Sequence, residues 1–155
     1  MRTMSNLKVT EITLAKPIIV VGKLFTGDYA KSPEYISVTM EILRSAGISF
    51  DERKVIGVYY DNPNNKKPEE LKSFQGVFID HSNIEIPGEL EICQLKGNFL
   101  YVKATGDIMK AIYEGYDALF NYIAENNVKL KSPAGYQVST IDNGNIVTEI
   151  YMETI

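Results

Sequence analysis

A short pattern occurs twice in the sequence, each time between a strand-like run and a helical one. Phe25-Thr26-Gly27-Asp28 follows an apolar run rich in β-branched residues, and Ala104-Thr105-Gly106-Asp107 follows another. Three more matches recur in the same order: Gly47-Ile48 with Asn127-Val128, Asp61-Asn62 with Asp142-Asn143, and 74–79 with 147–152. Matches in one order at similar separations indicate an internal repeat. We therefore expect a single domain, residues 1–155, made of two β-α-β-β halves at roughly 7–80 and 89–155.

Periodicity and turn residues predict the elements of each half. The first helix is expected from about Pro33, with Ser32 as its N-cap, to a stop at Gly47. The second is expected over 108–126, where apolar residues recur at helical spacing. Strands are expected at 8–14, 18–25, 55–60, 74–79, 89–95, 99–105, 136–141 and 146–153. These elements predict an α+β fold, in which an antiparallel sheet with pseudo-two-fold symmetry carries both helices on one face and leaves a central ligand groove on the other.

Charge and composition argue against several classes of partner. The net charge is −4, and Lys66-Lys67 is too short to form a basic footprint for nucleic acid. About seven residues precede the first expected strand, too few for a helix-turn-helix. No apolar run approaches the roughly 20 residues of a membrane span, and the N-terminus lacks the apolar segment of a signal peptide. We expect a cytoplasmic protein without direct contact to nucleic acid or membrane.

The sequence contains one cysteine and one histidine. Cys93 has no partner for a disulfide within the chain and lies in a strand-like run, where a half-buried thiol is expected. His81 lies in a polar loop, with no second histidine to complete a zinc site. Neither a metal nor another cofactor is expected.

Strand parity sorts the side chains of the strands expected at 99–105 and 146–153 into two faces, because successive residues of a strand point to opposite sides. One face is apolar and fits against the helices. The other is open and holds most of the aromatic rings. The helix face holds Leu100, Val102, Thr148, Ile150 and Met152, and the open face holds Phe99, Tyr101, Lys103, Val147, Glu149 and Tyr151.

Glu149 is the unusual residue of the open face, since strand interiors disfavour glutamate. A solvated charge that protects an edge strand is one explanation. The other is a carboxylate at the base of an aromatic-lined cleft, where a cationic or hydrogen-bonding ligand would pair with it. The candidate ligand-binding residues are Glu149, Tyr151, Tyr101, Phe99, Tyr59, Tyr60, Tyr113 and Tyr116. Gly57 leaves the faces of Tyr59 and Tyr60 open, and core packing competes with lining for Tyr113 and Tyr116.

Three segments resemble the GyrI-like small-molecule-binding domains, which are also the effector-binding domains of AraC- and MerR-type regulators. The segment 55–63 (VIGVYYDNP) is similar to the "iGiyyDdP" segment of that family. The segment 97–106 is similar to its "G-x-y-a-v" strand, and 147–152 (VTEIYM) to its terminal "tEiyiP". The resemblance extends over roughly residues 6–155.

The resemblance implies a duplicated β-α-β-β fold with a central groove. It also implies that Glu149 faces the ligand and, as in multidrug-responsive members, pairs with lipophilic cations. Two departures stand out. The strand after the second helix usually reads "yE-x-Y", whereas here Gln137 and Ser139 replace the Glu and the second Tyr. Glu153 replaces the usual Pro near the end. Ligand preference is therefore expected to differ.

Three functions follow from these features. The first is a stand-alone module that senses or sequesters an amphipathic or cationic compound and acts, in regulation, through a partner protein. The second is a hydrolase of strained electrophiles, implied by other members of the family, with Glu149 as general base and Tyr101 or Tyr151 orienting or protonating the substrate. The third is an interaction module of the gyrase-inhibiting kind, for which a net charge of −4 is mild.

Overall fold

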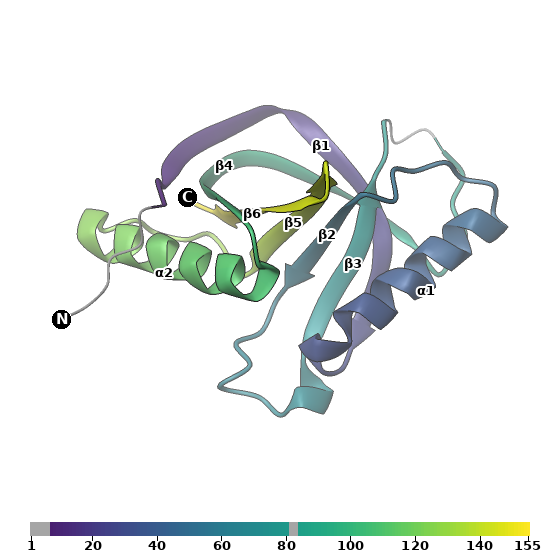
Figure 1. Cartoon of the computed structure of the whole chain (residues 1–155), viewed down its shortest axis with the longest axis horizontal. Coiled ribbons are helices and arrows are strands. Elements are labelled where there is room, and N and C mark those ends of the chain that lie inside the picture. Colours follow the sequence, from purple (N-terminus) through teal and green to yellow (C-terminus); the bar gives the residue numbers. More distant parts are fainter. Residues whose placement is uncertain (1–6, 81–83) are drawn as a thin grey trace.

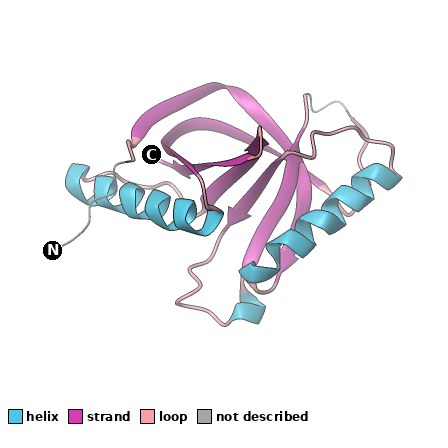
Figure 2. Cartoon of the chain, viewed as in Figure 1, coloured by secondary structure: helices cyan, strands magenta, loops and turns pink. Residues whose placement is uncertain are grey.

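The computed structural model describes residues 7–80 and 84–155 and shows two helices around one antiparallel sheet (Figures 1 and 2). The strands are β1 (Thr10–Thr26), β2 (Lys54–Tyr59), β3 (Lys72–Phe78), β4 (Glu91–Thr105), β5 (Gly135–Asp142) and β6 (Asn145–Glu153). The helices are α1 (Ser32–Ser45) and α2 (Ile108–Asn126), with short 3-10 turns at Tyr29–Lys31 and Pro68–Glu70. The α+β class expected from the sequence is confirmed.

The sheet closes on itself in the order β1-β3-β2-β5-β6-β4, and every pairing is antiparallel. The open sheet with a concave free face expected from the sequence is therefore wrong. Closure follows from two seams, β1 with β4 and β2 with β5, which satisfy the backbone groups at all the edges. The face opposite the helices becomes the inside of a barrel.

Two strands are longer than expected. β1 runs through Lys16-Pro17, and β4 runs through Gly97. The pairing of β1 with β4 shifts register between Leu14 and Ile18, and Gly97, opposite Leu14, has a φ of 106°. Because proline lacks an N–H, a register shift at this point lets the strand continue where the ladder loses a bond.

The helix ends follow local chemistry. α2 has the expected bounds: the Asp107 carboxylate accepts from the N–H of Lys110, and Asn127 closes the helix in the left-handed conformation. For α1 the expected N-cap was wrong by one residue, since Lys31 precedes the helix and Ser32 is its first residue. The Ser32 hydroxyl instead donates to the carbonyl of Tyr29 in the preceding 3-10 turn. Neither helix is long and apolar enough to cross a membrane.

Three hydrophobic clusters divide the core. One fills the barrel with residues from all six strands. Another lies between α2 and the outside of β4 and β6, and the third lies beneath α1. The parity prediction is confirmed for the helix face, where Leu100, Val102, Ile150 and Met152 are buried under α2. Full burial of a side chain of this size contributes roughly 1.5–3 kcal/mol, so these clusters hold the helices on the barrel.

Candidate functional site

The eight ligand-binding candidates fall on two faces of the sheet. Glu149, Tyr151, Tyr101 and Phe99 share the inner face, as the cross-strand pairs Tyr101–Tyr151 and Lys103–Glu149 require. Tyr59 and Tyr116 lie outside the barrel, and Tyr113 is a 74% exposed residue of α2. Tyr60 lies at the end of β2 in the alternation that points inward. One groove could not be lined by all eight.

Glu149 lies among aromatic rings inside the barrel. The Tyr101 hydroxyl donates to Glu149 Oε2 at 2.5 Å. The ring of Tyr151 meets that of Tyr101 edge-on at 5.0 Å and that of Phe99 at 6.1 Å. Tyr136, which the sequence did not single out, meets Phe99 at 5.9 Å. We call Phe99, Tyr101, Tyr136, Glu149 and Tyr151 the barrel-interior cluster.

Burial and the carboxylate together keep the tyrosines of this cluster protonated. Burial, with the hydrogen bond to Glu149, raises the pKa of Tyr101 well above its usual value. Burial and the same carboxylate raise the pKa of Tyr151 to about 12. Within residues 7–80 and 84–155, no lysine, arginine or histidine is within ion-pair distance of Glu149. Glu149 is thus a partly buried carboxylate balanced by neutral hydroxyls.

Tyr60, which follows the last residue of β2, lies near Cys93 and Tyr136. Burial is the main cause that raises the pKa of Tyr60 to about 12. Burial and the nearby Glu91 raise the pKa of the half-buried Cys93 thiol. Both residues therefore stay neutral at physiological pH, and the thiol is a poor nucleophile.

The outside of β2 and β5 forms a second candidate surface. α1 packs mainly on β3 and β1, and α2 packs mainly on β4 and β6, so the outer faces of β2 and β5 lie between the two helices (Figure 1). The floor is small and polar: Gln75, Gly57 and Gln137 lie side by side across β3, β2 and β5. We call this region, with the side chains that reach over it, the interhelical surface.

Two tyrosines reach over this floor from opposite sides. The Tyr59 ring lies over Gly57, and its hydroxyl donates to Ser32 Oγ at 3.2 Å. From α2, the Tyr116 hydroxyl occupies the place that a Cβ would take at Gly135. That hydroxyl accepts from Gln137 Nε2 at 2.8 Å. The glycines allow the rings to lie against the sheet.

The hydroxyl of Tyr116 is held neutral. Burial is the main cause that raises the pKa of Tyr116 to about 12, and the hydrogen bond from Gln137 opposes the shift. The Tyr116 ring stacks with that of Phe120 at 6.1 Å. The surface therefore presents aromatic rings and neutral polar groups.

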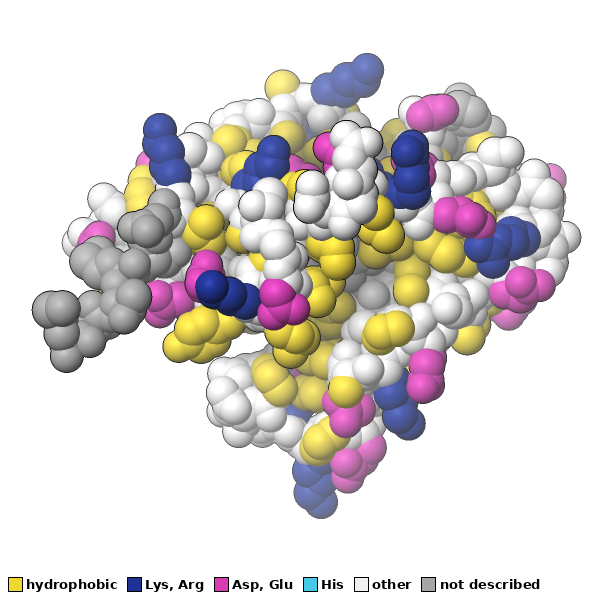
Figure 3. All heavy atoms as spheres, in the orientation of Figure 1, with side chains coloured by type: hydrophobic (Ala, Val, Ile, Leu, Met, Phe, Trp, Pro, Cys, Tyr) yellow, Lys and Arg dark blue, Asp and Glu magenta, His cyan; other side chains and the backbone are white. Residues whose placement is uncertain are grey.

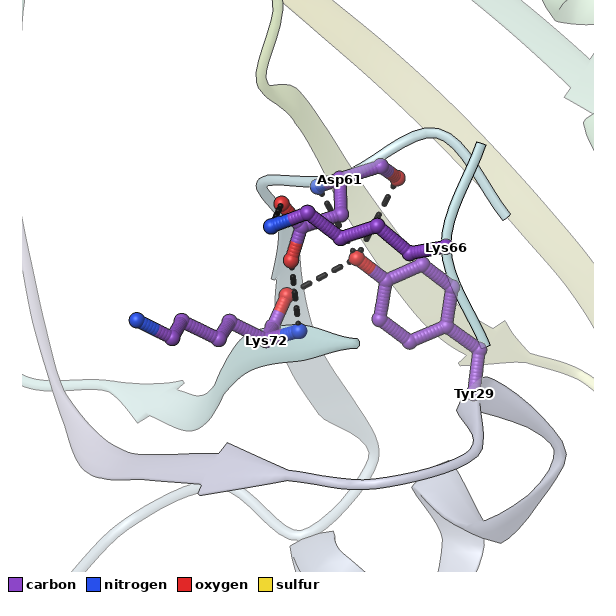
Figure 4. Close-up of polar contacts among 4 residues, drawn as sticks. All are labelled: Tyr29, Asp61, Lys66 and Lys72. Atoms are coloured by element: carbon purple, nitrogen blue, oxygen red, sulfur yellow. Dashed lines mark hydrogen bonds and ion pairs between the residues drawn. The ribbon is translucent and has the colours of Figure 1, made fainter. Parts of the chain in front are cut away.

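The edge of the interhelical surface is fixed by Tyr29 (Figure 4). Its ring meets Tyr59 edge-on at 4.8 Å. Its hydroxyl donates to the carbonyl of Lys72 at 2.8 Å and accepts from the N–H of Asp61 at 3.0 Å. The Asp61 carboxylate binds Lys66 Nζ at 2.9 Å and the N–H of Lys72 at 2.8 Å, and these bonds lower its pKa. The carboxylate at this edge is already compensated.

An exposed apolar stripe of α2 continues the surface. Met109 is 71% exposed, Tyr113 74% and Phe120 53%, at spacings that place them on the same side of the helix as Tyr116. In the space-filling view, hydrophobic side chains gather in a depression between the two helices (Figure 3). Exposed apolar side chains grouped in this way mark a binding surface more often than scattered ones do.

Sequence reasoning missed several residues of the interhelical surface. Gln137 was noted only as a departure from a family pattern, although it lies in the middle of the floor. Tyr29 and Gln75 were not singled out and Ser32 was predicted only as a helix cap, because their contacts with this surface join segments far apart in the chain. His81 lies outside the described residues.

One further hollow, of about 360 Å³, lies at the far end of α1. It is shallow and open, and its lining contains no aromatic ring: Glu41, Ile42, Ser45, Ala46, Pro87 and Glu89. Only a few apolar atoms line this hollow, and they lie near solvent. It is therefore a weaker candidate for a ligand site than the two aromatic surfaces.

The chain matches a known family and resembles several solved structures. The family model of the GyrI-like small molecule binding domain matches residues 8–154. The fold is similar to the EcmrR C-terminal domain (TM-score 0.70, 15% identity, 97% of this chain and 98% of that one). It is also similar to a hydrolase from Listeria innocua (0.59, 7%, 96% and 92%) and to SAV2435 bound to tetraphenylphosphonium (0.55, 14%, 97% and 94%). At these identities the likeness concerns the fold. No curated protein matches the sequence significantly.

Proposed function

Because the chain belongs to the family of GyrI-like small-molecule-binding domains, we propose that it senses or sequesters an amphipathic aromatic compound on the interhelical surface. One observation carries the proposal: the outer faces of β2 and β5 are left between the helices, under rings from both sides. A planar ligand would cover the exposed side of Phe120 and contact Tyr59 and Tyr116. Burying apolar area and stacking rings would supply most of the affinity.

In this proposal, the interhelical surface forms where the two halves of an internal repeat meet. In support, each half runs as a long strand, a helix and two shorter strands, with sheet orders β1-β3-β2 and β4-β6-β5. β2 and β5 are corresponding strands that pair with each other. A pseudo-two-fold axis between them would place the two helices symmetrically about the ligand. A sensor of this kind would act through a partner protein.

A second ligand position is proposed at Glu149, and it is favoured by a carboxylate that has tyrosine hydroxyls but no cation as partners. A lipophilic cation would pair with it and gain contact with the faces of Tyr101 and Tyr151. Entry would require the packed rings of the barrel-interior cluster to move apart. This position suits a cation, whereas the polar side chains that the described part of the chain places over β2 and β5, those of Ser32, Tyr59, Gln75, Tyr116 and Gln137, are uncharged.

A hydrolase is the alternative function, and the 2.5 Å contact of Tyr101 with Glu149 favours it. Glu149 would take a proton from water, and Tyr101, kept protonated by its raised pKa, would donate to the substrate. The test is release of nitrophenol from an aryl ester. More than one turnover per chain, lost in Glu149→Gln, supports the enzyme; an equal rate in both proteins excludes this pair.

Calorimetric titration with two aromatic probes of the same shape tests the binding proposal. Triphenylphosphine oxide is neutral, and methyltriphenylphosphonium is a cation. We expect at least one to bind the wild type, with affinity about fivefold lower in Phe120→Ala and unchanged in Glu149→Gln. Affinity that depends on Glu149 and not on Phe120 would move the site to the barrel interior. Absence of binding by both probes would overturn the proposed function.

A further inference from the structure

We propose that the interhelical surface selects an uncharged aromatic ligand carrying a hydrogen-bond acceptor over a cation of the same shape. The inference rests on the proposed function and names the ligand class of that site. It follows from the chemistry of the groups that line the surface, from their unused hydrogen-bonding capacity and from the compensation of the charge at its edge.

Every polar side chain that lines the surface is neutral. On the α1 side these groups are the hydroxyls of Tyr59 and Ser32 and the carboxamide of Gln75. Gln75 is 4% exposed, and its Nε2 donates to Ser32 Oγ and Ser73 Oγ. These groups satisfy one another, so this side provides shape and no charge.

The other side has hydrogen-bonding capacity to spare. Gln137 Nε2 uses one N–H on the Tyr116 hydroxyl, which accepts it. Within the described residues, neither the second N–H of Gln137, nor its carbonyl, nor the O–H of Tyr116 has a protein partner. The surface therefore offers two donors and one acceptor between aromatic walls, which suits a ligand with a carbonyl, phosphoryl or similar oxygen.

Charge at the edge does not change this preference. The Asp61 carboxylate is compensated by Lys66 Nζ and by the backbone N–H of Lys72. The exposed stripe of α2 contributes Met109, Tyr113 and Phe120, all uncharged. A cation that leaves water here would lose hydration without meeting an anion.

The aromatic rings offset that loss only in part, because their faces are partly occupied. A cation is attracted to ring faces rather than edges. Tyr116 and Phe120 stack on each other, and Tyr59 lies against Gly57 with its neighbour Tyr29 edge-on. A neutral ligand loses less hydration and gains the hydrogen bonds, so neutrality is favoured.

The deciding experiment compares the two probes on a protein whose interhelical surface is unmodified but which carries Glu149→Gln, because this substitution removes the second, cation-binding position proposed inside the barrel. We expect triphenylphosphine oxide to bind about tenfold more tightly than methyltriphenylphosphonium, because its oxygen accepts from Tyr116 or Gln137. A cation that binds as tightly as the oxide, or more tightly, overturns the inference while leaving the proposed function intact. Failure of both probes to bind overturns the proposed function itself.

A substitution at Gln137 should reverse the preference of the surface for a neutral ligand. Gln137→Glu places a carboxylate on the floor at nearly constant volume, and we expect it to raise affinity for the phosphonium about tenfold and to lower it for the oxide. Gln94→Glu, the same substitution at an exposed position of β4, is the matched control and should change neither affinity. A folded Gln137→Glu protein with unchanged preference overturns the inference. Should this variant fail to fold, the comparison of the two probes on the Glu149→Gln protein still decides.

Discussion

The two faces of the sheet use tyrosine in opposite ways. Inside the barrel, the ring of Tyr151 meets those of Phe99 and Tyr101 edge-on, and the Tyr101 hydroxyl donates to the Glu149 carboxylate. On the interhelical surface, Tyr59 and Tyr116 lie over glycines, with their hydroxyls on neutral partners. Tyr59, Tyr101 and Tyr116 are all half-buried and Tyr151 is buried, so the two faces differ less in burial than in the partners of the hydroxyls, a carboxylate inside the barrel and neutral groups outside it.

The two faces also separate stability from binding. Phe99 and Tyr151 of the barrel-interior cluster are buried and lose contacts on every side when they are removed, whereas Phe120 of the interhelical surface is 53% exposed. Substitutions on the inner face should therefore change the free energy of unfolding, and substitutions on the outer face should change ligand affinity. Paired variants test how sharply the two roles divide.

The largest difference is expected between two phenylalanines. Phe99 is 2% exposed and Phe120 is 53% exposed. Phe99→Ala should lower the free energy of unfolding by about 3–5 kcal/mol, because it leaves a cavity inside the barrel. Phe120→Ala should change it by less than ~0.5 kcal/mol. Urea unfolding followed by circular dichroism measures both, and equal losses would show that the stripe of α2 is structural.

A smaller effect, on ligand affinity, is expected when one methyl group is added to the floor of the interhelical surface. In Gly135→Ala the new Cβ takes the place of the Tyr116 hydroxyl, so the ring must move and its bond with Gln137 breaks. Affinity for triphenylphosphine oxide should fall about tenfold, or ~1.4 kcal/mol, while the fold is kept. Gly88→Ala is the control, since a Cβ there meets nothing within 4 Å. If calorimetry finds equal affinity in Gly135→Ala and Gly88→Ala, Tyr116 does not contact the ligand.

The carboxylate inside the barrel should be visible in a tyrosine titration. Glu149→Gln removes the charge next to Tyr101, so the pKa of Tyr101 should fall but stay above the usual tyrosine value, because burial is the larger cause of the shift. Absorbance at 295 nm against pH measures it. Glu125→Gln, at an exposed position of α2, serves as the control. An unchanged titration would mean that the Tyr101–Glu149 contact does not form in solution.

The last prediction concerns stability at alkaline pH. The pKa of Tyr116 is raised to about 12 in the fold, chiefly by burial, from the ordinary tyrosine value of 10.0. As pH rises, the unfolded chain loses this proton first, so the contribution to stability is complete below about pH 10 and is lost as pH approaches about 12. Tyr116→Phe should therefore lose less stability than the wild type over this interval. Parallel losses in urea unfolding at pH 9 and pH 11 would contradict the assignment.

Local features were predictable because they depend on neighbours in the chain. The bounds of α2 followed from the helical spacing of its apolar residues, and Asp107 and Asn127 fix them by acting on backbone groups a few residues away. The alternation of Ile150 and Met152 with Glu149 and Tyr151 followed from strand geometry alone. The long β1 and β4 were not predictable, because Pro17 and Gly97 read as breaks until the register of two distant strands is known.

For the candidate site, the sequence predicted the types of residue but not their arrangement. Aromatic residues and a strand carboxylate were recognised, but their distribution over two faces depended on closure of the sheet. Tyr59 and Tyr60 could not be separated from the sequence, and the structure places them on opposite faces. Gln137 lies on the floor because β5 pairs with β2, a strand far away in the sequence. No local sequence pattern could have predicted that pairing.

By itself, then, the sequence determined which residues form strands and helices, which side of each strand is apolar and which aromatic side chains are available. Those properties depend on short-range geometry and on hydrophobic periodicity. Only the tertiary structure decided which face became core and which remained accessible. Pairing at both seams satisfies the last free strand edges, and once the barrel closes, a carboxylate expected on an open surface is enclosed, while the strip between the helices is left to water.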